Sequence, residues 1–212
     1  MLARLLSEEE AKIGAATANG SKKKLIALLQ LAYSGELAAA HAYRGHWRSV
    51  RHANEKIAIR NIEEDEWRHR QFVGEMLVTL NAAPNKRREV RATIIGRVLG
   101  ALCHLMGWLA PMYGAGRLES RNIKEYETAA RYARDCGRND LVDCLLEMAE
   151  VEWEHELYFR TRVNEHFIGR RLPLWPQPPA KETIRLSFEQ EVFASSSEAP
   201  PTRIPAPAST VI

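Results

Sequence analysis

The residues best suited to chemistry in this 212-residue chain are two Glu-x-x-His motifs. One runs from Glu66 to His69 and the other from Glu152 to His155. Residues three apart share one face of an α-helix, so each motif offers a carboxylate and an imidazole to one metal ion or to adjacent ions. Each motif also interrupts a stripe of apolar residues at helical spacing. Because a buried carboxylate is costly unless it is paired or metal-bound, the sequence predicts a partner in the interior.

A glutamate on a neighbouring helix would extend the first motif. Glu36 lies on an apolar stripe about one helical hairpin upstream of Glu66. The midpoint between the two residues falls just before the turn expected at residues 51–54. If the two helices are antiparallel, the two carboxylates should therefore meet at one level of the protein.

The second motif has three candidate partners upstream. Glu119, Glu125 and Glu127 all lie about one hairpin before Glu152, so spacing alone does not choose among them. Helical phase separates them only in part, since Glu125 and Glu127 point away from the face that carries Glu119 and Tyr126.

The pattern favours a dinuclear metal site over a bundle with buried ion pairs. A single Glu-x-x-His motif is more often a surface pair than a ligand set, but two motifs on core stripes, each with an upstream glutamate, favour a ligand set. Oxygen-rich ligands with two imidazoles and no thiolate suit iron or manganese better than copper or structural zinc. The other five histidines lack comparable spacing and are interpreted as surface or packing residues: His41, His46, His52, His104 and His166.

Long helices must position these motifs. Apolar residues at spacings of three and four predict helices over residues 22–50, 54–80 and 140–167. The apolar segment 92–116 predicts a shorter helix that is interrupted between Gly107 and Pro111 and passes into a further long helix ending near residue 134. The long path between the second and third long helices is typical of a crossover. The expected fold is all-α, a ferritin-like four-helix bundle with an apolar crossover helix.

Proline marks the end of the expected bundle. Eight of the ten prolines follow Arg171, so residues 168–212 are predicted to be a Pro-rich, largely irregular tail. The stretch 183–193 within it receives no assignment. Residues 1–20 are an N-terminal extension, and residues 21–167 form the bundle.

Composition excludes several classes of protein. A net charge of +3 is too small to indicate a nucleic-acid-binding protein. Three cysteines without CxxC spacing form neither a disulfide framework nor a zinc site. The first thirty residues contain no continuous apolar stretch of the secretory type, so a cytoplasmic protein is expected.

Four segments carry a family resemblance. They are SGELAAAHAYRGH (34–46), DEWRHRQF (65–72), the glycine-rich stretch 98–120 and EVEWEHELYF (150–159). Together they resemble the demethoxyubiquinone hydroxylases of ubiquinone biosynthesis, which belong to the ferritin-like diiron carboxylate superfamily. The resemblance covers about residues 25–167.

This resemblance implies a metal centre and a reaction. It selects Glu119 from the three candidates. The centre would hold two iron ions, with manganese as the alternative, and no catalytic residue beyond the ligands is implied. The implied activity is that of an O2-dependent monooxygenase that uses dioxygen, an unidentified reductant and a lipophilic, quinone-like substrate. The implied ligands are Glu36, Glu66, His69, Glu119, Glu152 and His155.

Two features depart from the family pattern and bear on the substrate. Glu125 precedes Tyr126 where the family has a His-Tyr pair, and the Pro-rich tail replaces a closing apolar helix. A ferritin- or rubrerythrin-like protein that oxidises iron or reduces peroxide is the alternative function, and a metal-free interaction module is a third. The apolar segment 92–116 could lie on the inner face of a membrane as a peripheral contact or be buried as a core crossover. A homo-oligomer is compatible with the sequence.

Overall fold

The computed structural model describes residues 2–197, with side chains placed for residues 15–190. Within that range the chain forms α-helices, two short 3-10 turns and no strand, which confirms the all-α expectation. The helices are α1 (Leu2–Ser49), α2 (Ala53–Thr79), α3 (Lys86–Leu102), α4 (Leu109–Asp135), α5 (Val142–Glu165) and α6 (Glu182–Ser197).

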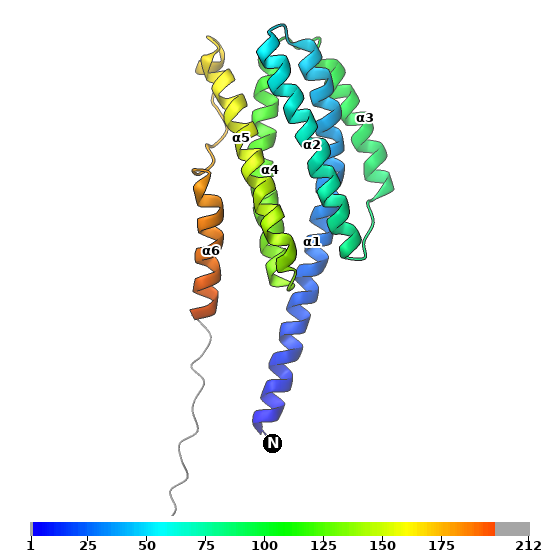
Figure 1. Cartoon of the computed structure of the whole chain (residues 1–212), viewed down its shortest axis with the longest axis vertical. Coiled ribbons are helices and arrows are strands. Elements are labelled where there is room, and N and C mark those ends of the chain that lie inside the picture. Colours follow the sequence, from blue (N-terminus) through cyan, green and yellow to red (C-terminus); the bar gives the residue numbers. More distant parts are fainter. Residues whose placement is uncertain (1, 198–212) are drawn as a thin grey trace, which may run out of the picture.

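Four of these helices form the bundle and a fifth covers it. α1 packs against α2, α4 packs against α5, and α1 also contacts α4. α3 lies along the outer side of α1, on the path that leads from α2 back to α4 (Figure 1). The predicted bundle with an apolar crossover helix is therefore confirmed.

Local sequence explains several helix ends. The side chain of Asn85 accepts hydrogen bonds from the backbone N–H groups of Arg87 and Arg88 and so caps the start of α3. Gly107 and Gly137 have φ angles of 72° and 76°, a conformation that favours glycine, and they lie in the turns that follow α3 and α4. α1 begins at Leu2 rather than near Lys22, because residues 2–21 contain no proline to break the helix.

The bundle contains two apolar cores, one on each side of a polar layer. One core includes Leu29, Val73 and Leu145, and the other includes Ile59 and Phe159. Along each of the four helices, a buried glutamate lies between residues of the first core and residues of the second. The packing therefore fixes all four glutamates at one depth.

α1 and α3 approach each other closely at glycines. A Cβ atom added at Gly45, Gly96 or Gly100 would collide with the backbone of the facing helix. The inner face of α3 is thus used for this contact, and its outer face leaves large apolar side chains exposed: Val90, Ile94, Ile95, Val98 and Leu99.

One described stretch is long and apolar enough to cross a membrane. It is Ala15–Ser49, within α1. Core helices pass the same test of length and composition. This stretch packs against α2, α3 and α4 and carries the buried Glu36, as expected of a core helix.

The chain after α5 returns along the bundle. Trp175 is buried next to Gly116 and donates from Nε1 to Glu156 at 2.5 Å. The unassigned stretch 183–193 lies within α6, where Ile184 and Phe188 join the first apolar core. Residues 198–212 of the expected tail lie outside the described residues.

Candidate metal centre

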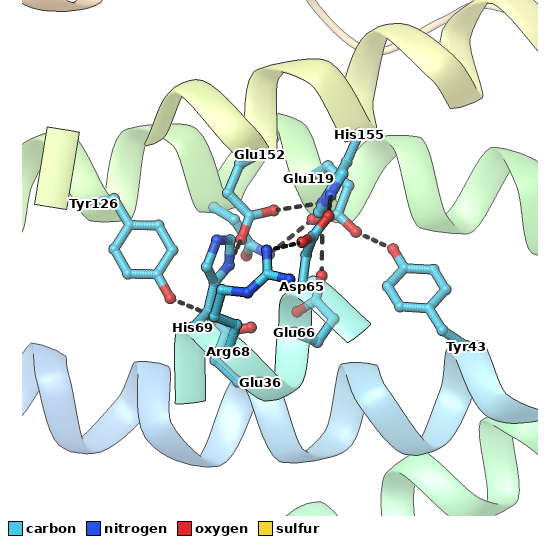
Figure 2. Close-up of polar contacts among 11 residues, drawn as sticks. Glu36, Tyr43, Asp65, Glu66, Arg68, His69, Glu119, Tyr126, Glu152 and His155 are labelled. Carbon is cyan, nitrogen blue, oxygen red and sulfur yellow. Dashed lines mark hydrogen bonds and ion pairs between the residues drawn. The ribbon is translucent and has the colours of Figure 1, made fainter. Parts of the chain in front are cut away.

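The structure brings the six predicted side chains together in the polar layer between the two apolar cores. None is more than 4% exposed. Figure 2 shows side chains from four helices pointing toward one another. The contributing residues are Glu36 on α1, Glu66 and His69 on α2, Glu119 on α4, and Glu152 and His155 on α5.

These side chains form two overlapping donor sets. Within each set, one ligand atom from every residue lies within 4.8 Å of the others. Glu66 and Glu152 belong to both sets, so the sets are adjacent and share two carboxylates. The first set is Glu36, Glu66, His69 and Glu152, and the second is Glu66, Glu119, Glu152 and His155.

Several donor atoms in the layer are unsatisfied. Oε2 of Glu36, both carboxylate oxygens of Glu66, Oε2 of Glu152 and Nδ1 of His155 are buried and make no hydrogen bond to the described residues. Buried polar atoms without partners are rare in folded proteins. A cluster of them around shared carboxylates fits bound cations, which would supply the missing partners.

Two carboxylates are held by tyrosines in a reciprocal arrangement. The Tyr126 hydroxyl on α4 donates to Oε1 of Glu36 on α1, and the Tyr43 hydroxyl on α1 donates to Oε1 of Glu119 on α4. Asn122 Nδ2 donates to the other oxygen of Glu119 at 3.0 Å. Sequence reasoning did not identify these three supports. The available signal is that each glutamate precedes a tyrosine by two helical turns on its own helix.

A carboxylate outside the layer orients one histidine. Asp65 Oδ2 lies 3.2 Å from Nε2 of His155. Nδ1 of the same ring then faces the layer, 3.7 Å from Glu66 Oε1 and 3.6 Å from Glu152 Oε2. In the other half, Nδ1 of His69 lies 3.1 Å from Glu152 Oε1. Asp65 was also missed, although it stands next to Glu66 in the motif.

A family model described as ubiquinone biosynthesis protein COQ7 matches residues 23–132, just over half of the chain. The chain belongs to the COQ7 family. The match includes the first motif and Glu119, whereas Glu152 and His155 lie beyond it and are placed in the cluster by the structure. No curated protein and no solved structure gives a significant match.

The COQ7 family is a family of enzymes in ubiquinone biosynthesis, so this chain belongs to an enzyme family. The ubiquinone pathway also implies a lipophilic, quinone-like substrate. The buried Glu/His cluster could hold a metal ion. The family match contains three of the four segments that carry the resemblance, and the fourth, residues 150–159, lies beyond it.

In this COQ7 family member, burial and neighbouring charges shift the pKa values of the clustered carboxylates. Burial, followed by the charges of Glu36 and Glu152, raises the pKa of Glu66 well above its usual value. Burial and Glu152 do the same to the pKa of Glu119. Burial would also raise the pKa of Glu152, but hydrogen bonds with His155 and His69 lower it instead.

The alternative helix-α4 carboxylates do not join the cluster. Glu125 pairs with Arg121 at 2.7 Å and belongs to neither donor set. Glu127 is half-buried and belongs to neither donor set. Glu119 is fully buried and belongs to one of them. The geometry therefore favours Glu119, the residue that the family resemblance selected.

Asp65→Ala should weaken metal binding without unfolding the protein. Loss of a carboxylate that orients a ligating histidine typically costs roughly tenfold to hundredfold in affinity. Equilibrium dialysis against Mn(II) measures the effect, and Glu64→Ala is the matched control because Glu64 is exposed and adjacent. Equal affinities for the two variants would contradict a supporting role for Asp65.

Proposed function

We propose that this COQ7 family member is a diiron carboxylate oxidoreductase, an O2-dependent monooxygenase that hydroxylates a lipophilic, quinone-like molecule. The observation that carries the proposal is the pair of overlapping buried donor sets with unsatisfied atoms. Oxygen and imidazole donors without thiolate suit iron, with manganese as the alternative. Two divalent cations would also balance the charge of four carboxylates.

The proposed ligands have distinct roles. Glu66 and Glu152 would serve both ions, because both occur in both donor sets. Glu36 and His69 would complete one ion's ligands. Glu119 and His155 would complete those of the other.

The reaction divides between the ions and the chain. Bound iron would supply the activation of dioxygen and the redox chemistry. One oxygen atom enters a C–H bond of the substrate, and the other leaves as water with two electrons and two protons from an external reductant. The chain's own contribution is to hold geometry and exclude water: Tyr43 and Tyr126 fix two carboxylates, and Met112 and Phe159 belong to the apolar core beside them.

The exposed apolar outer face of α3 is consistent with a lipophilic substrate and with a peripheral membrane contact. Apolar side chains are exposed along this helix and continue into the turn after it, where Leu105 is 81% exposed. Basic residues at the start of α3 would face anionic headgroups. They are Lys86, Arg87, Arg88 and Arg91.

The function is tested on purified protein loaded with Fe(II). With a reductant and dioxygen, we expect a demethoxyquinol to be converted to its hydroxylated product, and mass spectrometry with 18O2 should show one labelled atom in that product. Rapid ferrous oxidation with no hydroxylated product would favour the ferritin- or rubrerythrin-like alternative. Absence of bound metal would refute both. Rescue of a strain that cannot complete ubiquinone synthesis tests the same proposal in cells.

A further inference from the structure

A groove with a volume of about 390 Å³ runs between α1 and α3. This volume is within the range of small-molecule sites, about 300–1,000 Å³. Every titratable side chain that the structure places in its lining is basic, and none of the six proposed metal ligands belongs to it. The basic side chains are Arg44, Arg48, Arg97, His41 and His104.

Each helix contributes one row of basic side chains to the groove. Residues three, four or seven positions apart share a face of a helix, and both rows have this spacing. Between the rows, Gly45 and Gly100 line the groove without a side chain, and a Cβ atom added at Gly45 would collide with the backbone of Gly100. The close contact of the two helices therefore holds the rows on either side of a bare floor. The α1 row is His41, Arg44 and Arg48, and the α3 row is Arg97 and His104.

The arginine charges of the groove exceed the acidic charge beside it. Arg44 donates from Nε to Oε1 of Glu63 at 2.7 Å, and the same carboxylate also accepts from two tryptophan Nε1 groups. Arg48 lies over the ring of Trp47, 4.8 Å from its centroid, and pairs with no carboxylate of the described residues. Arg97 makes neither a hydrogen bond nor an ion pair within the described part of the chain. Two of the three arginine charges therefore have no carboxylate partner there.

The pKa of His41 reflects the positive charge in the groove. Burial, followed by the charges of Arg97 and Arg44, lowers this pKa. The imidazole is therefore neutral at physiological pH and keeps one N–H donor. A neutral donor between guanidinium groups can bind an anion without adding to the repulsion among them.

We propose that this groove binds the phosphate group of a phosphate monoester. The two unbalanced charges, on Arg48 and Arg97, match the charge of such a group, about −1.5 to −2 at neutral pH. Guanidinium groups also suit phosphate by shape, because each can donate two parallel hydrogen bonds to its oxygens. A single carboxylate would leave one positive charge unbalanced. This binding does not depend on the proposed oxidoreductase function, since the groove contains no residue of the metal cluster.

The experiment measures the binding of inorganic phosphate and of acetate to the full-length protein by calorimetry, at constant ionic strength. The variants are Arg48→Gln and Arg97→Gln. The control is Arg117→Gln, which removes the same charge from an exposed position on α4 outside the groove. We expect the parent chain to bind phosphate more tightly than acetate. Each groove variant should weaken phosphate binding roughly tenfold to hundredfold, the value of a hydrogen bond to a charged group, and the control should not.

Vesicles identify the source of the phosphate group. The basic residues at the start of α3 lie outside the groove lining, so vesicle binding by the protein is not by itself evidence for the groove. Cosedimentation with phosphatidylcholine vesicles that contain phosphatidate is therefore compared between the parent chain and Arg97→Gln. Loss of both free phosphate and vesicles in the variant would assign the phosphate to a lipid. Loss of free phosphate alone would assign it to a soluble ester.

Four results would overturn the phosphate site. The first is no binding of phosphate by the parent chain, and the second is equal affinity for phosphate and acetate. The third is an equal loss in the groove variants and in the control, which would reflect net charge alone. The fourth is a loss confined to vesicles, which would make the arginines surface charges. Circular dichroism of each variant is measured in parallel, so that a loss of binding is not mistaken for a loss of fold.

Discussion

Glu66→Gln should give a folded, helical protein that has lost nearly all of its bound metal. Glu66 belongs to both donor sets, so its replacement removes a ligand from each ion. The substitution keeps the volume of the side chain and removes a fully buried carboxylate whose two oxygens have no hydrogen-bond partner among the described residues. Because burial raises the pKa of Glu66, holding this residue in the metal-free interior at neutral pH costs free energy that a neutral glutamine avoids, so the metal-free variant should unfold at a higher temperature than the metal-free parent.

Plasma mass spectrometry measures the loss of metal. Thermal unfolding with and without EDTA measures the change in stability. The same loss of metal is expected for Glu152→Ala, since Glu152 is the other shared carboxylate. Glu125→Gln is the matched control, because Glu125 is paired with Arg121, is 25% exposed and belongs to neither donor set. Retention of stoichiometric iron in either ligand variant would refute the assignment of the shared carboxylates.

The sequence could predict the two Glu-x-x-His pairs of the buried cluster because their pattern is local. Each Glu-x-x-His pair lies on one helix, and its position on an apolar stripe indicates burial. Register between helices is not local. Tyr126 on α4 supports Glu36 on α1, and Tyr43 on α1 supports Glu119 on α4. These contacts between helices can be identified only once the packing of the helices is known. For the same reason, spacing could not choose among three glutamates on α4.

His46 illustrates a second limit. The lack of a partner at ligand spacing predicts that His46 is a surface or packing residue, and its burial agrees with packing. What the sequence cannot show is that both ring nitrogens lack partners, because this depends on every side chain around them. Tertiary contacts also explain the stretch 183–193. It lies within helix α6, and Ile184 and Phe188 pack it against the first apolar core.

The metal-free protein should lose stability as the pH rises from 6.5 to 9. Burial alone would lower the pKa of His155, but hydrogen bonds with Asp65 and Glu152 raise it from 6.5 to about 9. The folded state therefore favours the protonated imidazole. This stabilisation is complete below about pH 6.5 and is lost as the pH rises through 9. For a shift of this size the loss is about 3 kcal/mol.

Between pH 6.5 and 9, the buried carboxylates either lower the stability of the metal-free protein as the pH rises, as His155 does, or leave it unchanged. Glu36, Glu66 and Glu119 have raised pKa values, so their contribution is greatest when they are neutral and declines as the pH rises through those values. Glu152 has a lowered pKa, and its contribution is lost only as the pH falls below about 4.5. It therefore adds no slope between pH 6.5 and 9.

Bound metal should reverse this trend. Cations displace protons from histidines and carboxylates, so their affinity, and the stability that they add, increase with pH. Thermal unfolding at pH 6.5 and 9, at constant ionic strength, with EDTA or with Mn(II), should show the two curves diverging. Asp65→Asn removes a charge that raises the pKa of His155 and should flatten the EDTA curve. If the two curves ran parallel, metal binding would not displace protons from the six buried side chains, and the proposed metal site would be contradicted.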